Sequence, residues 1–108
     1  MRVLVCGGRD FNDSDFIHNT LCDVNAKRGP IEVVIHGAAK GIDNQAMIWA
    51  QMMGIKHAPF QAEWHRYGKL AGPMRNERML VDGKPDLVVA FPGGRGTADC
   101  VRRARLRN

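Results

Sequence analysis

Positively charged side chains accompany three glycine-rich turns in this chain of 108 residues. The turns are the segments 7–10, 37–41 and 92–97, and they contain Arg9, Lys40 and Arg95. Glycine lets a backbone approach a ligand closely, and the free N–H groups at a helix N-terminus attract anions. This combination predicts a site for a phosphate-bearing ligand.

The segment 72–76, Gly-Pro-Met-Arg-Asn, adds a further cation. Proline suits the first turn of a helix, so we expect Arg75 to project from that turn toward the same rim, beside Asn76. A surface salt bridge is the alternative role of Arg75. Neither the Walker A pattern nor G-x-G-x-x-G is present, which argues against a P-loop enzyme and a standard dinucleotide site.

Three carboxylates follow the glycine-rich turns and are candidates for acid–base work: Asp10, Asp43 and Asp99. We expect Asp10 or Asp43 to meet sugar hydroxyls. Asp43 and Asp99 come early in expected helices, where the helix dipole alone also stabilises a carboxylate. Helix capping is therefore the alternative role of both.

The elements that must position these residues alternate between strand and helix. Short apolar runs predict four strands, at about residues 2–6, 31–36, 55–60 and 87–91. Apolar periodicity and terminal glycine or proline predict four helices, at about 14–28, 41–53, 73–81 and 96–106. Residues 61–70 are interpreted as a loop over the ligand, in which Trp64, His65 and Tyr67 are candidates to stack on a base.

This alternation predicts a single α/β domain over residues 1–108, a Rossmann-like three-layer sandwich. The strands are nearly continuous apolar runs, which favours a parallel sheet with helices on both faces. With right-handed crossovers the expected strand order is 3-2-1-4. Ligands bind where such winding reverses, which here is between the first and fourth strands. An exposed sheet edge also predicts a homo-oligomer.

Composition limits the partners. The formal net charge of +5 favours phosphate-bearing partners, from nucleotides to nucleic acid. Part of the excess lies at residues 102–107, as either a solvated helix end or a DNA-binding patch. No run is long enough to span a bilayer, and we expect a cytoplasmic protein. The three cysteines lack a C-x-x-C pair and the histidines lack ligand spacing, so no metal, cofactor or disulfide is expected.

In their order along the chain, the segments 6–11, 36–43, 72–76 and 92–97 resemble the SLOG superfamily. The resemblance is greatest to its YspA-like group, small Rossmann-like proteins of bacteria and phages. It implies a nucleotide or nucleotide-derived ligand that is sensed or processed. The implied binding residues are Gly7, Gly8, Arg9, Asp10, Gly37, Lys40, Asp43, Arg75, Asn76, Pro92, Gly93, Gly94, Arg95, Gly96 and Thr97.

Two related families imply alternative functions. The LOG-type phosphoribohydrolases, which cleave the N-glycosidic bond of nucleoside 5′-monophosphates, continue Pro-Gly-Gly-x-Gly-Thr with x-Glu-Glu. That resemblance implies Arg75 and Asp99 as catalytic residues, but Cys100 takes the second glutamate position, and a thiol does not replace a carboxylate beside an oxocarbenium-like centre. Enzymatic activity is therefore left open.

The DprA/Smf proteins, which bind single-stranded DNA, contain Gly-x-Ala-Arg-Gly-Ile-Asp and a later Arg-Asn. Residues 37–43 and 75–76 are similar, with Lys40 in place of the arginine. The additional domains of that family are not in this sequence. Binding of single-stranded DNA is thus a third possibility that the resemblance implies.

Overall fold

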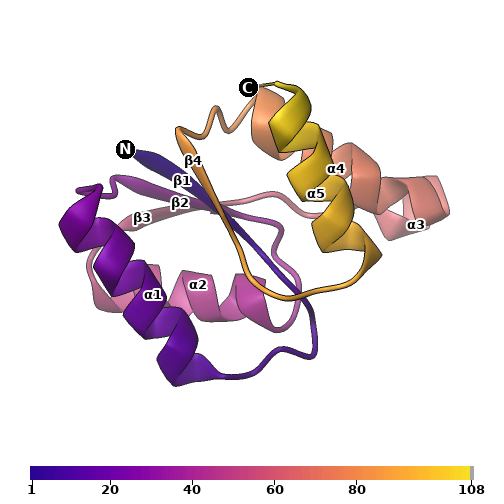
Figure 1. The fold of residues 1–108 in the computed structure, drawn as a ribbon. Coiled ribbons are helices and arrows are strands. Elements are labelled where there is room, and N and C mark those ends of the chain that lie inside the picture. The colour runs from indigo at the N-terminus through magenta and orange to yellow at the C-terminus, as the bar shows by residue number, and fades with distance from the viewer. Residues whose placement is uncertain (108) are drawn as a thin grey trace.

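The chain folds into a four-stranded parallel sheet with helices on both faces (Figure 1). The structure is a computed structural model that describes residues 1–107. The strands are β1 (Arg2–Cys6), β2 (Val33–His36), β3 (Lys56–Pro59) and β4 (Leu87–Ala90). The helices are α1 (Ser14–Lys27), α2 (Ile42–Met52), α3 (Trp64–Tyr67), α4 (Ala71–Val81) and α5 (Arg95–Leu106), with a 3₁₀ turn at Gly68–Leu70. The strand order is β3-β2-β1-β4, so the predicted fold class and order are confirmed.

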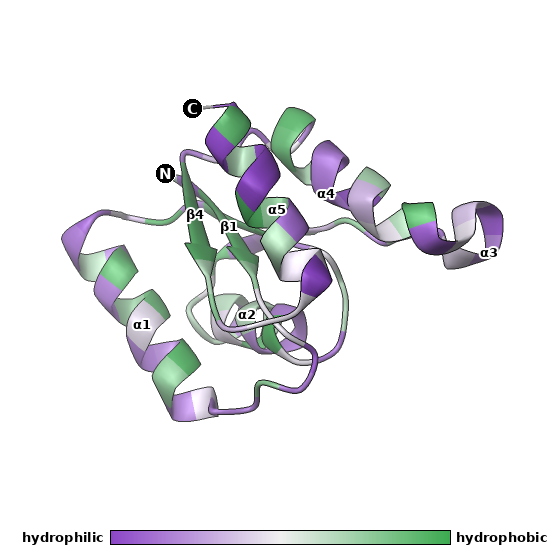
Figure 2. Ribbon diagram, turned by 45° about the vertical axis from the view of Figure 1, so that its right-hand side comes forward, coloured by the Kyte–Doolittle hydropathy of each residue, from purple (hydrophilic) through white to green (hydrophobic). Residues whose placement is uncertain are grey.

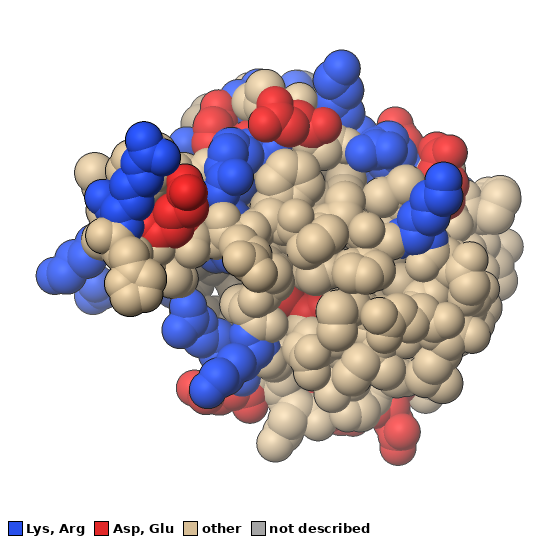
Figure 3. All heavy atoms as spheres, turned by 180° about the vertical axis from the view of Figure 1, so that it is seen from behind, with Lys and Arg blue, Asp and Glu red and all other residues tan. Residues whose placement is uncertain are grey.

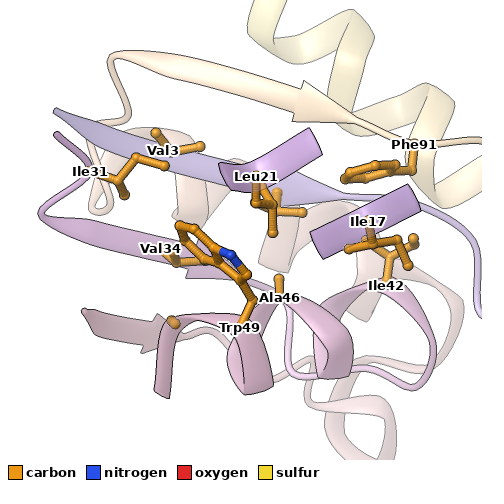
Figure 4. Close-up of a cluster of buried hydrophobic side chains, with 11 residues drawn as sticks. Val3, Ile17, Leu21, Ile31, Val34, Ile42, Ala46, Trp49 and Phe91 are labelled. Carbon is orange, nitrogen blue, oxygen red and sulfur yellow. The ribbon is translucent and has the colours of Figure 1, made fainter. Parts of the chain in front are cut away.

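Successive residues of β1 point to opposite faces of the sheet and so belong to two different cores. Val3 and Val5 pack against α1 and α2. Figure 4 shows this cluster, in which side chains of both helices meet those of the strands. Its labelled members are Val3, Ile17, Leu21, Ile31, Val34, Ile42, Ala46, Trp49 and Phe91.

The second core lies under α4 and α5. Leu4 and Cys6 of β1 point into it, together with Ile35 of β2. Their partners are Met79 of α4 and Cys100 of α5. β1 and β4 are mainly hydrophobic, whereas α5 also presents hydrophilic residues (Figure 2). The two cores fix the ends of β1 and β4, where the glycine-rich turns begin.

Residues 64–70 differ from the prediction of a loop over 61–70, because they form α3 and the 3₁₀ turn. A segment of this length shows no helical period, and a tertiary contact helps to hold it. A Cβ built on Gly72 would lie 3.1 Å from the edge of the Trp64 ring. The next helix accordingly begins at Ala71, slightly before Pro73. None of the helices within residues 1–107 has the length and apolar character needed to cross a membrane.

Candidate functional site

The glycine-rich turns that follow β1 and β4 lie against each other. The Gly8 N–H donates to the Pro92 carbonyl at 2.9 Å. A Cβ on Gly8 would lie 3.0 Å from the Cα of Gly93, and one on Gly93 would lie 2.7 Å from the Gly8 nitrogen. Both positions therefore need glycine for close packing, and the Gly8 amide is already used within the protein.

A cleft of about 740 Å³ opens beside these turns. Figure 3 shows a hollow at its left, between the lobe that carries α3 and the rest of the molecule, with Lys and Arg side chains around it. The predicted site residues that line the cleft are Gly7, Gly8, Arg9, Asp10, Asp43, Arg75, Asn76, Gly94, Arg95, Gly96, Thr97 and Asp99. The structure thus brings Arg9 and Arg95 to one cleft, while Gly37, Lys40, Pro92 and Gly93 are not part of its lining.

The N-terminus of α5 is the most open backbone feature of the cleft. Its cap residue, Gly94, makes no side-chain capping hydrogen bond. A Cβ on Gly94 or Gly96 would meet nothing within 4 Å. Backbone N–H groups in the first turn of a helix that lacks a side-chain cap form a favourable anion site, because they and the positive end of the helix dipole both face the anion.

Arg75 is held from two sides. Its Nη1 donates to the Gly37 carbonyl at 2.7 Å, and its Nε donates to Asn76 Oδ1 at 2.9 Å. A Cβ on Gly37 would collide with the guanidinium, so Gly37 makes room for Arg75. Burial lowers the pKa of Arg75, while the Asp43 charge opposes that shift. The side chain remains cationic at neutral pH, because an arginine does not deprotonate in proteins.

Asn76 is only 3% exposed and fully engaged. Its Nδ2 donates to the Gly96 carbonyl at 3.1 Å and to Asp99 Oδ2 at 3.0 Å, while its Oδ1 accepts from Arg75. One amide therefore connects the cleft arginine to the first turn of α5. These bonds give Asn76 a positioning role, and its direct contact with a ligand stays a prediction.

The two carboxylates that sequence reasoning treated alike have different surroundings. Asp99 accepts from Asn76, from Arg102 at 2.7 Å and from Arg103 at 2.9 Å. Burial alone would raise the pKa of Asp99, but the hydrogen bonds from Asn76 and Arg103 outweigh it and the pKa is lowered. Asp99 is thus committed to holding α5.

Asp43 is 7% exposed and lies in the cleft lining. Burial raises its pKa, against the Ala39 N–H, which donates to Oδ2 at 3.3 Å, and the Arg75 cation. Asp43 is therefore a buried acid with few internal partners. It can accept a hydrogen bond from a ligand hydroxyl or, when protonated, donate one to it.

A histidine pair supports the turn after β2, and sequence reasoning did not find it. His36 Nε2 lies 3.0 Å from His57 Nδ1, and the Ala38 N–H donates to His36 Nδ1 at 3.1 Å. Burial and then the His57 charge lower the pKa of His36 to about 4. His36 is therefore neutral at pH 7, and the pair braces the turn that carries Gly37. Its only sequence signal is a histidine in each of two neighbouring strands.

The position of Cys100 bears on the predicted hydrolase. Cys100 is 1% exposed and packs in the core under α5, outside the cleft lining. Cys6 is also buried, whereas Cys22 is exposed, and all three are free thiols. Position 100 therefore supplies no carboxylate to the cleft. The carboxylate of Asp99 is already engaged with Asn76, Arg102 and Arg103.

Comparison with known proteins gives two matches. Residues 1–67 match the model of the family described as YAcAr, the YspA, cpYpsA-related SLOG family. The "Gene 61 protein" of Mycobacterium phage D29 is 39% identical over an alignment 112 residues long with gaps, which covers 96% of this chain and 88% of that protein. No solved structure matches the chain significantly.

Proposed function

The chain belongs to the YspA, cpYpsA-related SLOG family, and on this premise we propose that it binds a nucleotide or nucleotide-derived ligand in the cleft beside β1 and β4. Membership of this family points in general to nucleotide-related ligands. One observation carries the proposal: the uncapped N-terminus of α5 opens into the same cleft as Arg9, Arg75 and Arg95.

In this proposal the phosphate binds at the first turn of α5. The open space at Gly94 and Gly96 supports this position, because an oxygen can approach the backbone there. Arg95 and Arg9 supply charge from the two neighbouring turns, and Arg75 adds a third cation. The turn after β1 contributes mainly through Arg9, since the Gly8 amide already donates to Pro92.

The sugar is proposed to meet Asp43, with Asp10 as the alternative. Asp43 is the buried carboxylate of the cleft with few internal partners, so a ligand hydroxyl can satisfy it. Lys40 lies at the surface outside the lining, and we assign it only a long-range contribution to the attraction of anions.

The contacts favour neither alternative over this proposal. A hydrolase that relies on Asp99 would need a carboxylate that already binds Asn76, Arg102 and Arg103. For DNA binding, the basic end of α5 is partly neutralised, because Arg107 pairs with Glu77 while Arg102 and Arg103 pair with Asp99. Both activities stay predictions from the resemblance.

The test is ligand-induced thermal stabilisation. Adenosine, guanosine, cytidine and uridine 5′-monophosphates at millimolar concentration are added to the wild type, to Arg95→Ala and to Arg105→Ala. A ligand that binds only the folded state raises the Tm by mass action. We expect at least one nucleotide to raise the Tm of the wild type and of Arg105→Ala, and to leave Arg95→Ala nearly unchanged.

Arg105 is the matched control, since it lies on the same helix but not in the cleft lining. An unchanged wild-type Tm across the nucleotide panel contradicts the proposal. An equal loss in both arginine variants contradicts the assignment of the phosphate to the α5 N-terminus.

A further inference from the structure

An indole is exposed at the wall of the cleft. Trp64 lines the cleft and is 46% exposed, although tryptophan is one of the largest apolar side chains. It belongs to α3, the short helix that projects at the right of Figure 1. A half-exposed tryptophan in a cleft presents a flat apolar surface that water solvates poorly, and such surfaces often bind ligands.

The other tryptophan shows what a purely structural role looks like. Trp49 is 2% exposed in the core, and its Nε1–H donates to Cys22 Sγ at 3.2 Å. Trp64 instead rests the edge of its six-membered ring over Gly72, where a Cβ would lie 3.1 Å from Cη2. This edge contact fixes the position of the ring and leaves much of its surface uncovered.

The ring already accepts a flat, positively charged group. The guanidinium carbon of Arg9 lies 5.7 Å from the centre of the Trp64 ring, in a cation–π arrangement. Arg9 is exposed at the cleft and therefore able to change rotamer. The face it covers is thus accessible to another planar group.

The lining also has an apolar part that a bare sugar phosphate would leave unused. Trp64, Pro73 and Met79 contribute it, alongside the charged Arg9, Arg75 and Arg95. A volume of about 740 Å³ is in the range of sites for single small molecules. The lining therefore suits one ligand with both an anionic group and a flat, weakly polar group.

We infer that the ligand carries an aromatic base, and that this base stacks on Trp64 in place of the Arg9 guanidinium, which then turns toward the phosphate. This inference rests on the proposed function and deepens it by naming the ligand class. The site is then selective for a nucleoside 5′-phosphate over a sugar phosphate. Trp64 is its specificity-determining residue.

Calorimetric titration separates the base from the phosphate. Ribose 5-phosphate and the four nucleoside 5′-monophosphates are titrated into the wild type, Trp64→Ala, Trp64→Phe and Leu70→Ala. Stacking on an aromatic side chain contributes enough for a tenfold effect on Kd. We expect the best nucleotide to bind the wild type at least tenfold more tightly than ribose 5-phosphate, and Trp64→Ala to reduce this ratio to below about threefold.

The variants separate stacking from folding. Trp64→Phe keeps a flat ring and is expected to retain most of the preference. Leu70→Ala changes another exposed apolar residue close in sequence, outside the cleft lining, and is expected to behave as the wild type. If Trp64→Ala does not fold, the comparison of Trp64→Phe with Trp64→Leu decides, since leucine keeps apolar bulk without a ring.

Fluorescence gives an independent measurement. In Trp49→Phe the indole of Trp64 is the only one left, and stacking is expected to quench it on addition of the nucleotide but not of ribose 5-phosphate. Equal binding of ribose 5-phosphate and nucleotides overturns the inference while leaving the phosphate site intact. Failure of all these ligands to bind overturns the proposed function as well.

Discussion

Two regions on either side of the cleft treat charge in opposite ways. At the end of β2 and the start of α2, burial disfavours the charged forms of His36 and Asp43. Between α4 and α5, Asp99 and Glu77 are paired with arginines of α5. In the first region both ring nitrogens of His36 are engaged, and Asp43 keeps unused bonding capacity at the cleft. The second region uses its charges to hold two helices together.

This difference shows that a local sequence pattern does not determine whether a carboxylate is ion-paired or free to bind a ligand. Asp43 and Asp99 both follow a glycine-rich turn near a helix N-terminus. Asp99 has arginines three and four residues later, within its own helix, and Asn76 from the neighbouring one. Asp43 has backbone amides, mainly that of Ala39, and the Arg75 charge nearby, but no ion pair. Their partners, rather than their positions, separate the structural acid from the candidate functional acid.

The largest effect is expected from protonation of His36. Its pKa is about 4 in the folded protein and 6.5 in the unfolded chain, so the unfolded chain binds the proton more readily. The free energy of unfolding should therefore fall as the pH drops from 6.5 to 4, by up to about 3 kcal/mol. Urea unfolding at several pH values measures this decline.

His36→Asn is the matched variant, because asparagine still offers an acceptor to the Ala38 amide but does not titrate. Its stability should change less over the same pH window. Parallel curves for both proteins would show that His36 is not responsible.

Removal of Asp99 is expected to give the next largest effect. Asp99→Ala removes one acceptor each from Asn76, Arg102 and Arg103, and should lower the free energy of unfolding by about 2 kcal/mol at pH 7. The folded pKa of Asp99 is lowered, so its contribution is present above pH 3.8 and is lost as the pH falls through the folded pKa. A cost that does not shrink in acid contradicts this account.

Asp43→Asn should change stability with pH in the direction opposite to that of Asp99→Ala: it should become more stable relative to the wild type as the pH rises. The folded pKa of Asp43 is raised, so the wild-type carboxyl becomes less favourable as the pH rises from 3.8 through the folded pKa. Relative to the wild type, the amide variant should gain stability over that window, by about 1 kcal/mol, and it should bind nucleotide about tenfold more weakly. Denaturant unfolding at pH 3 and pH 7, with titration of the ligand, tests both effects.

The smallest effect is expected at the solvent side of the network. Glu77 pairs with Arg103 and Arg107, but its side chain is 40% exposed. Glu77→Ala should cost less than about 1 kcal/mol, and 1 M NaCl should remove most of that cost. A larger loss of unfolding free energy, or one that salt does not reduce, would contradict the description of Glu77 as a solvent-screened ion-pair partner.

Much of the fold could be predicted from the sequence. The apolar runs located β1 and β4, and the handedness of crossovers then left one natural strand order, which the structure has. The segment of α3 was interpreted as a loop, because four residues show no period and a contact with Gly72 helps to hold them. The predicted homo-oligomer stays a prediction.

The candidate site was predictable in outline. Charged residues beside glycine-rich turns at the carboxyl ends of neighbouring strands converge in one cleft, as Arg9 and Arg95 do. The partners within the site were not predictable, since Asn76 and Gly37 are close to their contacts only after folding. The same holds for the pair of His36 and His57, which comes from two adjacent strands.

The sequence by itself determined which residues form the parallel strands and which turns must be glycine-rich, because apolar runs and backbone freedom are local properties. Only the tertiary structure decided which carboxylate is paired with arginines, which helix N-terminus is uncapped and which tryptophan lines the cleft. Those outcomes depend on burial and on partners from distant segments, since desolvation and hydrogen bonding act across space rather than along the chain.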